Sequence, residues 1–388
     1  MTKVCCLNPI AKVGTRNFTD KYTFTDNLQE ADVVLVRSAS MHELELPDSL
    51  DAIARAGAGV NNIPLDVCTE KGIVVFNTPG ANANGVKELV IAGMLLAARD
   101  IGGGIRWGQN NKDDENIGKS MEKAKKAFAG TEIKGKTLGV IGLGAIGIEV
   151  ANAADALGMH VIGYDPFLSV SGALRLSRHV KIKEKQEDIF READYITLHV
   201  PLLDTTKYTI NKESLAMMKD GVVILNYARD LLVNDDDLAE ALESGKVHRY
   251  MTDFPTPKVA NLPSVIATPH LGASTAESED NCAVMAVDEL RDYIETGRIR
   301  NSVNYPTCTL DPDPCAARIC ILNVNKPNMI VRLSSILSDA GINIPNMANQ
   351  SRGDAAYTVI DCDTVPDDSL IEKLRQVEGV KKVRVIYH

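Results

Sequence analysis

TLGVIGLGAIG, residues 137–147, is an apolar stretch that runs directly into a glycine-rich turn. The run Thr137–Ile141 predicts a strand buried on both faces, and the residues after the turn predict a helix to about Leu157. A second apolar run, Val161–Tyr164, predicts the next strand, which ends at Asp165. Strand, turn, helix and strand in this order predict one βαβ unit of a doubly wound parallel sheet.

The glycine spacing in this turn is typical of a dinucleotide site, although a plain packing turn would also show it. Gly142 would make the tight turn, Gly144 would let a pyrophosphate approach the backbone, and Gly147 would let the helix pack on the strand. Asp165 follows Gly142 by 23 positions, where a carboxylate binds ribose hydroxyls and repels a ribose phosphate. These residues favour NAD as the cofactor over NADP.

Further apolar runs extend the α/β pattern on both sides of this unit, so we expect two doubly wound lobes of the Rossmann and flavodoxin-like type. The expected strands are Val33–Val36, Ile73–Phe76, Tyr195–His199, Val222–Asn226 and Val265–Ala267. The expected helices are Val86–Arg99, which Gly102-Gly103-Gly104 would end, Asp235–Glu243, and a long helix that ends at Thr296.

The C-terminal part predicts a separate ferredoxin-like module, because its elements follow the order βαββαβ. The expected elements are Ile319–Val324, Asn328–Ala340, Asn343–Asn349, Ala356–Cys362, Asp368–Gln376 and Val380–Tyr387. We therefore expect a linker of 305–316 and a C-terminal domain of 317–388. Pro306, Pro312 and Pro314, with Asp311 and Asp313, mark the linker.

The composition excludes several classes of protein. Of the 388 residues, 45% are hydrophobic and 24% charged, as in ordinary globular domains. The net charge of −10 argues against nucleic acid as a partner. The longest apolar stretch, Leu89–Ala98, is too short to span a membrane, and the first residues lack a signal-peptide core, so we expect a cytoplasmic protein. The eight scattered cysteines form no CxxC pair, and we expect no metal site.

Two side chains at expected strand ends could carry chemistry. Arg229 follows the strand Val222–Asn226, and its guanidinium fork suits a carboxylate, although a lone arginine is more often a surface ion pair. His270 follows the strand Val265–Ala267, and an imidazole can take a hydroxyl proton near neutral pH while a hydride leaves the same carbon. A lone histidine is more often a packing or capping residue.

Two other features could line a ligand site. The loop AGAGVNNI, residues 56–63, contains small residues whose amides could receive an anion, or it is a plain turn. His199 also ends an expected strand. It lies nearer the glycine-rich turn in sheet order, so we expect it to line the cofactor site or to be structural.

Several motifs in order resemble one known family. AGAGVNNIP, GLGAIG followed by YDP, HVPL, NYARD and TPHLGAST resemble the NAD-dependent D-2-hydroxyacid dehydrogenases over about Val33–Ser302. The segment Ala317–His388 resembles the ACT regulatory domain. The resemblance implies a discontinuous substrate-binding domain of residues 1–98 and 272–304 and an NAD-binding domain of residues 99–271. This combination implies NAD-dependent hydride transfer from 3-phospho-D-glycerate, which would form 3-phosphohydroxypyruvate in the first step of serine biosynthesis.

The resemblance also implies roles for individual residues. His270 would be the acid/base, and Arg229 would hold the substrate carboxylate and polarise the forming carbonyl. Arg37 would face the substrate phosphate. The expected substrate-binding set is Arg37, Ser38, Gly57, Ala58, Gly59, Val60 and Asn82. The expected cofactor-binding set is Gly142, Gly144, Ala145, Ile146, Gly147, Asp165, His199, Val200, Pro201, Ala228, Asp253 and Gly272.

The sequence departs from the family at the histidine and next to the arginine. The family has a glutamate that holds the imidazole, but no glutamate lies between Asp253 and His270. If Asp253 does not replace it, the base is weaker near neutral pH and the pH-rate profile is shifted. Asp230 stands where the family usually has glycine, which places a negative charge beside an anion site.

The ACT-like segment departs as well. Asn325 and Asn343 match serine-binding asparagines of the family, whereas Asn323 replaces a histidine and Asn328 replaces a glycine. We expect L-serine as an effector, bound through Asn323, Asn325 and Asn343 at an interface between two such modules, and a homodimer or homotetramer.

Two other functions fit the same sequence. One is a dehydrogenase for another D-2-hydroxy acid. The other is a non-catalytic NAD(H)-sensing protein, which would bind NADH tightly without turnover.

Overall fold

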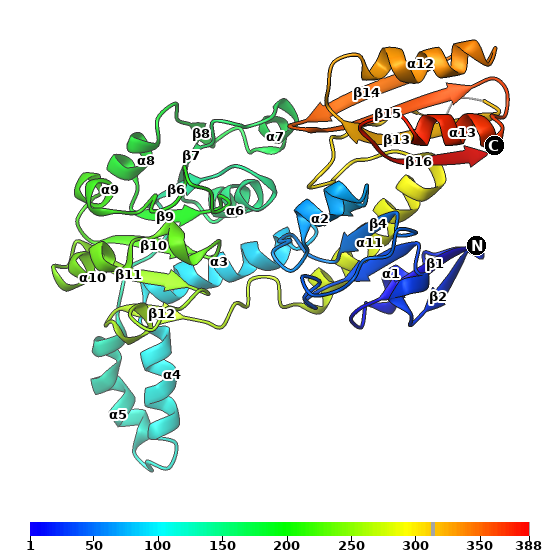
Figure 1. Cartoon of the computed structure of the whole chain (residues 1–388). Helices are drawn as coiled ribbons and strands as arrows, with labels where there is room; N and C mark the ends of the chain where they lie inside the picture. Colours follow the sequence, from blue (N-terminus) through cyan, green and yellow to red (C-terminus); the bar gives the residue numbers. More distant parts are fainter. Residues whose placement is uncertain (312–314, 388) are drawn as a thin grey trace. The chain divides into compact units, whose positions relative to one another are not determined.

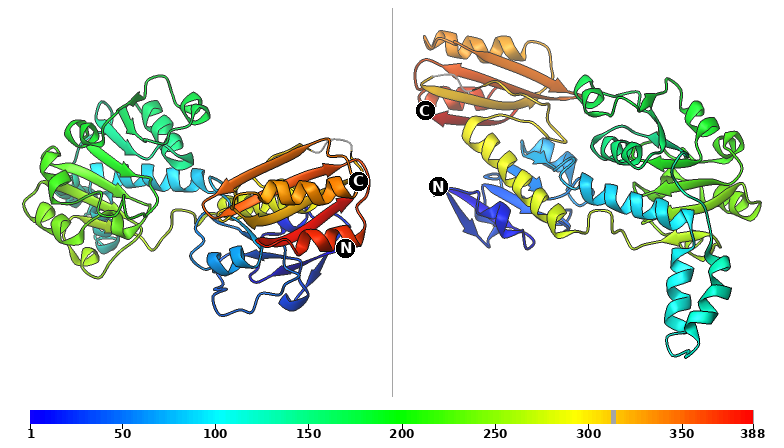
Figure 2. Two further views of the ribbon diagram at one scale, coloured as in Figure 1. Left: turned by 45° about the horizontal axis from the view of Figure 1, so that its top comes forward. Right: turned by 180° about the vertical axis from the view of Figure 1, so that it is seen from behind.

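The computed structural model describes residues 1–311 and 315–387, so the expected linker residues Pro312, Asp313 and Pro314 lie outside the described residues. The chain forms two compact units, Met1–Asn82 with Ala276–His388, and Ala83–Thr275. Figure 1 labels the elements of both units, and Figure 2 shows them from two further directions. We describe each unit by itself.

The first unit contains a parallel five-stranded sheet of order β2-β1-β3-β4-β5. Its strands are β1 (Thr2–Cys6), β2 (Tyr22–Thr25), β3 (Val33–Val36), β4 (Ala52–Arg55) and β5 (Val74–Phe76). The short helices are α1 (Lys12–Thr15), α2 (Leu65–Glu70) and the 3-10 turn η1 (Leu28–Glu30). The long helix α11 (Ala276–Thr296) packs on this sheet through Ala286, Leu290 and Tyr293. The expected strands at Val33 and Ile73 are therefore confirmed, the second beginning one residue later.

The second unit contains a parallel seven-stranded sheet of order β12-β11-β10-β9-β6-β7-β8. The strands are β6 (Thr137–Ile141), β7 (His160–Tyr164), β8 (Lys181–Ile182), β9 (Tyr195–Leu198), β10 (Val222–Asn226), β11 (Val247–Thr252) and β12 (Val265–Ala267). The helices are α3 (Ala83–Ala98), α4 (Ile101–Asn110), α5 (Ile117–Ala124), α6 (Ala145–Ala156), α7 (Val170–Arg175), α8 (Gln186–Glu192), α9 (Lys212–Met217) and α10 (Asp235–Glu243), with 3-10 turns η2 (Lys125–Phe128), η3 (Asp230–Leu232) and η4 (Val259–Asn261). The predicted βαβ unit is β6-α6-β7, whose two strands are neighbours in the sheet between β9 and the edge strand β8.

Two expectations for this unit were wrong. Helix α3 belongs to it rather than to the first lobe, because its apolar residues Val90, Met94 and Ala97 pack in the same core as β6 and α6, so the boundary lies after Asn82 and not after residue 98. The three glycines at 102–104 do not end a helix but lie in the first turn of α4, where the Asp100 carboxylate caps the helix by accepting a hydrogen bond from the Gly103 amide.

Helices α4 and α5 lie side by side as a hairpin that projects from the second unit (Figures 1 and 2). Ile105 and Met121 on this hairpin are 56% and 49% exposed, and Ile101 and Ile117 are each 37% exposed. Exposed apolar side chains at helical spacing on two neighbouring helices are typical of a face that packs against another chain.

The ACT-like module has the predicted βαββαβ order. Its antiparallel sheet has the order β14-β15-β13-β16 and consists of β13 (Ala317–Val324), β14 (Met347–Arg352), β15 (Ala355–Cys362) and β16 (Val380–Tyr387). Helices α12 (Met329–Asp339) and α13 (Asp368–Arg375) pack together on one face through Leu333, Leu337 and Leu374. The second strand begins at Met347, four residues later than predicted, because Pro345 interrupts the segment before it.

The other face of the ACT-like module packs against α11 and the five-stranded sheet of the same unit. Cys320, Leu322 and Tyr357 share a core with Tyr293 of α11. The Arg384 guanidinium lies 4.5 Å from the centroid of the Tyr293 ring and 3.0 Å from the Asp51 carboxylate at the start of β4. The expected linker is not a free connection, since Tyr305 and Cys308 are buried in the same core.

One ion pair of the module is fully buried. Arg318 donates to both oxygens of Asp361, at 2.6 and 3.0 Å, and both side chains are 0% exposed. The same guanidinium donates to the carbonyls of Thr296, Leu310 and Asp311. Because its donors are satisfied, this charge can lie in the interior, and it ties the module to the end of α11.

Among the described residues, no helix is long and apolar enough to cross a membrane, and no cluster of three potential metal ligands occurs. The eight cysteines are unpaired thiols.

Candidate active site

The glycine-rich turn has the geometry that a dinucleotide needs. Gly142 has φ of +94°, and a Cβ there would lie 2.5 Å from the His199 carbonyl oxygen. A Cβ on Gly144 would instead meet no atom within 4 Å, so open space faces the backbone where a pyrophosphate would approach. Gly144 is the N-cap of α6 and no side chain caps this helix, which leaves the amides of its first turn, from Ala145 to Gly147, to receive an anion.

Asp165 is held beside this turn. Its two carboxylate oxygens accept hydrogen bonds from the amides of Leu143 and Phe167, both at 2.8 Å. The acid therefore lies at the carboxyl end of β7 in a fixed orientation, with lone pairs left to accept from ribose hydroxyls. The turn, the uncapped helix and this acid fit NAD.

His199 is a neutral histidine beside the turn. Burial lowers its pKa to about 3, and its Nε2 lies 2.9 Å from the Thr197 hydroxyl. It follows β9, and Val200 next to it would contact a Cβ on Gly142. Of the other expected cofactor residues, Pro201 is exposed and Ala228 is half-buried after β10. A neutral imidazole here suits a wall of the cofactor site and not a proton carrier.

Arg229 and His270 are brought together by a residue that the sequence did not single out. The Phe254 ring lies 4.5 Å from the His270 ring, centroid to centroid, and 5.8 Å from the Arg229 guanidinium carbon. Arg229 follows β10, Phe254 follows β11 and His270 follows β12, three adjacent parallel strands whose carboxyl ends share one edge of the sheet. Both polar side chains are exposed at this edge.

The backbone of His270 is constrained. Its φ is +49°, and its amide donates to the carbonyls of Asp253 and Thr268 at 2.9 and 3.1 Å. A non-glycine residue in this region of φ is uncommon and clusters at functional sites, where the surrounding structure holds it. Arg229 is held similarly, since the Asn226 side chain accepts from its amide and donates to its carbonyl.

Asp253 is buried next to these residues but does not hold the imidazole. Its Oδ2 accepts a hydrogen bond from the Gly272 amide at 2.9 Å, and its Oδ1 is buried without a partner among the described residues. Burial raises the pKa of Asp253, while the Gly272 amide, His270 and Arg229 act in the opposite direction. Within the unit Ala83–Thr275, no glutamate hydrogen-bonds the His270 ring.

The expected substrate residues of the first unit gather at the carboxyl edge of its parallel sheet. Arg37 and Ser38 follow β3, Gly57–Val60 follow β4, and Asn82 lies in the segment after β5. Three successive amides, of Arg37, Ser38 and Ala39, donate to Asn8 Oδ1 at 3.0 to 3.1 Å. The Ser38 amide is therefore already paired, and only its side chain is left to contact a ligand.

Two side chains, Arg55 and Asn77, hold the loop after β4 in place. The Arg55 guanidinium donates to the carbonyls of Arg37, at 2.9 Å, and of Gly59, and the Asn77 side chain donates to the Ala58 carbonyl at 2.6 Å. With their carbonyls held, the amides of Ala58, Gly59 and Val60 make no hydrogen bond to another described residue. This arrangement supports the expectation that the loop receives an anion.

Asn82 Oδ1, a buried oxygen in the segment that follows β5, lacks a hydrogen-bond partner among the described residues. Thr78, in the same segment, hydrogen-bonds the Cys282 thiol. Buried polar atoms are usually paired, so a missing partner indicates a place where a ligand or water binds.

The asparagines expected to bind serine divide into two kinds. Asn323 is 2% exposed, its amide donates to the Val324 carbonyl and its oxygen accepts from Thr358, so the expected ligand role of Asn323 does not fit. Asn325 and Asn343 are exposed. Asn328 has φ of +68°, which asparagine tolerates better than most residues, so it can replace the glycine of the family at the start of α12.

Sequence reasoning missed several residues that hold the site loops and side chains in place. They are Asn8, Arg55, Asn77 and Phe254. Each lies within two residues of an expected site residue or directly after a strand of the sheet. Position after a parallel strand was the available signal, but the partner of each side chain is fixed only by the fold.

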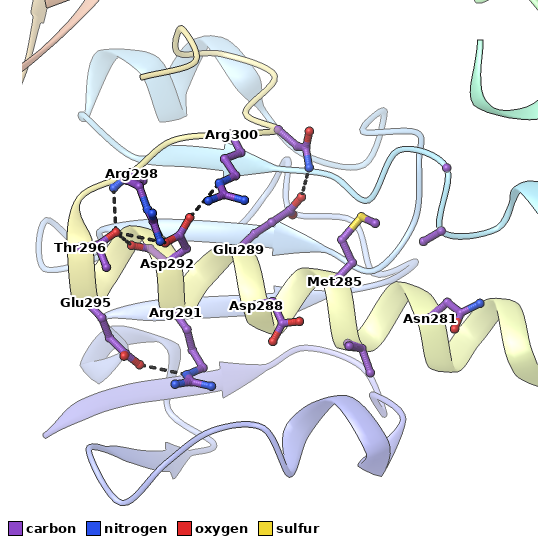
Figure 3. Close-up of a pocket in the computed structure, with 14 residues that line it drawn as sticks. Asn281, Met285, Asp288, Glu289, Arg291, Asp292, Glu295, Thr296, Arg298 and Arg300 are labelled. Carbon is purple, nitrogen blue, oxygen red and sulfur yellow. Dashed lines mark hydrogen bonds and ion pairs between the residues drawn. The ribbon is translucent and has the colours of Figure 1, made fainter. Parts of the chain in front are cut away.

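A cavity of about 800 Å³ lies along α11, and Gly80 and Ala81, which precede Asn82, form part of its wall (Figure 3). Acidic and basic side chains alternate on its wall. The Asp292 carboxylate accepts from Arg298 and Arg300, and Glu289 accepts from the Asn301 side chain at 2.6 Å. Glu289 is 8% exposed, and burial raises its pKa to about 8.

Comparison with known proteins agrees with this geometry. Residues 91–272 match the family model described as "D-isomer specific 2-hydroxyacid dehydrogenase, NAD binding domain". The chain is 40% identical over 276 residues to hydroxypyruvate reductase of Thermotoga maritima, covering 68% of this chain and 85% of that protein. The chain belongs to the D-isomer specific 2-hydroxyacid dehydrogenase family. The matched family model describes an NAD-binding domain, in agreement with the Gly142 turn and Asp165.

Two phosphoglycerate dehydrogenases are also similar to it. D-3-phosphoglycerate dehydrogenase of Methanocaldococcus jannaschii is 36% identical over 309 residues, which cover 77% of this chain but 57% of that protein, so the chain spans little more than half of this relative. The NAD+-bound crystal structure of 3-phosphoglycerate dehydrogenase from Entamoeba histolytica is 30% identical with a TM-score of 0.62, covering 78% of this chain and 98% of that one.

Proposed function

We propose that this enzyme oxidises 3-phospho-D-glycerate to 3-phosphohydroxypyruvate with NAD, as the first step of serine biosynthesis. The observation that carries the proposal is the group Arg229, Phe254 and His270 at the carboxyl edge of the sheet that also holds the Gly142 turn. The similarity to the M. jannaschii and E. histolytica phosphoglycerate dehydrogenases supports this substrate.

The chemistry follows from the side chains. His270 takes the proton of the substrate hydroxyl as the carbon-bound hydrogen leaves as hydride, and it returns a proton in the reverse reaction. Arg229 binds the substrate carboxylate with its fork of donors and polarises the forming carbonyl oxygen. Bound NAD supplies the hydride acceptor. Asp253 is held buried by Gly272, where it orients the nicotinamide end of the site.

We assign the substrate phosphate to Arg37, and the free amides of Ala58, Gly59 and Val60, with the Asn82 side chain, to the substrate carboxylate. A phosphate carries close to two negative charges at neutral pH, and a guanidinium is a common receptor for it. An acidic protein needs such local positive charge to bind an anionic substrate.

A second candidate is reduction of an unphosphorylated 2-keto acid. The T. maritima relative is named a hydroxypyruvate reductase. In addition, the Glu279 carboxylate already forms an ion pair with Arg37, the residue that we assign to the substrate phosphate. Measuring kcat/KM for 3-phosphohydroxypyruvate and hydroxypyruvate with NADH separates the two. A higher value for the phosphorylated acid supports the main proposal, and the reverse order supports the second candidate. NADH binding without turnover of either would instead indicate an NAD(H)-sensing protein.

The proposal includes assembly, regulation and location. A homodimer or homotetramer is supported by the apolar side chains exposed on the α4–α5 hairpin, and Ile105→Glu should reduce the mass measured by light scattering if that face pairs.

L-serine would bind through Asn325 and Asn343 and slow turnover, and unchanged rates in millimolar serine would refute this. A cytoplasmic location is supported by the eight unpaired cysteines.

A further inference from the structure

Glu279 forms an ion pair with Arg37, the arginine that we assign to the substrate phosphate. It is in the first turn of α11, and its Oε1 lies 2.5 Å from Arg37 Nη2. The two side chains are 43% and 46% exposed. The pair is therefore open to solvent, and an arriving anion can separate it without unfolding the helix.

The local charges show what this contact does. Arg55, the second arginine at this edge, donates to the carbonyls of Arg37 and Gly59 and so braces the loop. Burial raises the pKa of the nearby Cys282 thiol; Arg37 and Arg55 act to lower this pKa, and Glu279 acts to raise it. One carboxylate thus offsets one of two positive charges at the place where a dianionic group would bind.

We propose that Glu279 is an internal counter-ion that occupies Arg37 and sets the preference between phosphorylated and unphosphorylated substrates. This inference rests on the proposed function, in which Arg37 receives the phosphate. A phosphorylated acid must displace Glu279 and then remain near its negative charge. An unphosphorylated acid leaves the pair intact, so the same site accepts it without this penalty.

The effect should be moderate and dependent on salt. A carboxylate about 5 Å from a phosphate in a water-exposed site weakens binding on the order of tenfold at low ionic strength. Exposed charges are screened over about 10 Å at 0.1 M salt, so the effect should shrink as salt is added. A merely structural contact at the start of α11 would show neither substrate selectivity nor this salt dependence.

The test compares Glu279→Gln with the wild type and with Asp280→Asn. Asp280→Asn is the matched control, since it removes the same charge one residue further along α11, and Asp280 makes no hydrogen bond or ion pair with Arg37 in the structure. The full-length proteins are assayed for reduction of 3-phosphohydroxypyruvate and of hydroxypyruvate by NADH at low and high salt. A glutamine keeps a hydrogen bond to Arg37 but no charge.

We expect Glu279→Gln to lower KM for the phosphorylated acid about tenfold at low salt, with kcat unchanged, KM for hydroxypyruvate within twofold, and no effect of Asp280→Asn. Equal changes for both substrates, or none, would overturn the inference.

A binding measurement without turnover distinguishes failure of this inference from failure of the proposed function. The melting temperatures of Glu279→Gln and of the wild type are measured in inorganic phosphate and in chloride of equal ionic strength. Phosphate should raise the melting temperature of Glu279→Gln more than that of the wild type. If phosphate stabilises both equally, Glu279 is no counter-ion, whatever the enzyme oxidises.

Discussion

The amide of Gly272 donates a hydrogen bond to the carboxylate of Asp253, with 2.9 Å between the nitrogen and Oδ2. Asp253 therefore hydrogen-bonds the backbone two residues past His270 and makes no hydrogen bond to the imidazole. His270 is positioned instead by its own backbone bonds and by the Phe254 ring. His270, the acid-base residue that we propose, is therefore oriented by packing where the family uses a glutamate.

Asp253→Asn should leave the pH dependence of kcat/KM nearly in place. The asparagine oxygen can accept from the Gly272 amide as the carboxylate does, so the fold around His270 is kept. Only the weaker through-space effect of the charge is lost, which should move the midpoint of the profile by less than about half a pH unit. The check is a pH profile of both proteins with the same substrate. A shift of a full unit or more would show that Asp253 governs the imidazole after all.

Asp165→Asn should weaken NAD binding about tenfold, because a charged acceptor of two ribose hydroxyls is replaced by a neutral one. It should also reduce the discrimination against NADP, since the carboxylate no longer repels a ribose phosphate. Titration of NADH and NADPH fluorescence measures both effects. Asp155→Asn, an acid of the same domain that bonds Ser177 and His179, is the control. Unaltered NADH affinity in Asp165→Asn would remove Asp165 from the cofactor site.

Glu289→Gln should stabilise the protein at high pH and not at low pH. The folded state raises the pKa of Glu289 from 4.5 to about 8, so it favours the protonated form. Below pH 4.5 both states are protonated and folding is not penalised, whereas the penalty grows as the pH rises toward 8, to at most about 5 kcal/mol. Glutamine is always neutral and can still accept from Asn301.

Thermal unfolding at pH 5 and pH 8 checks this. The difference in melting temperature between Glu289→Gln and the wild type should be larger at pH 8. Exposed Asp280→Asn, nine residues earlier on α11, controls for the general loss of an acid. A melting temperature lowered equally at both pH values would mean that Glu289 is buried in its charged form.

Local sequence signals were sufficient for much of the fold. The β6-α6-β7 unit was predicted because the strand pattern, the glycine turn and the acid after β7 all lie within about thirty residues. Strand β11 was missed because its residues, VHRYMT, mix polar and apolar side chains without a clear period, although it is buried between β10 and β12. The glycines of α4 were misjudged because one cap, Asp100, outweighs their poor helix propensity.

Contacts between distant residues could not be predicted in the same way. The docking of Arg384 on Tyr293 and Asp51 joins residues about 90 and more than 300 positions apart, and no local pattern marks it. The counter-ion of Arg37 is likewise 242 residues away. At the candidate site, the residue types and strand ends were predicted, whereas Phe254 between Arg229 and His270 emerged only from the register of three adjacent strands.

The central claim is that His270 carries the proton in a hydride transfer, and the rate of NADH formation from 3-phospho-D-glycerate by His270→Ala tests it most directly. Acid-base residues typically contribute 10²- to 10⁴-fold, so kcat should fall by that factor while the dissociation constant of NADH, measured by fluorescence, stays within a few fold of the wild type. A variant that binds NADH normally and still turns over at a near wild-type rate would contradict the account.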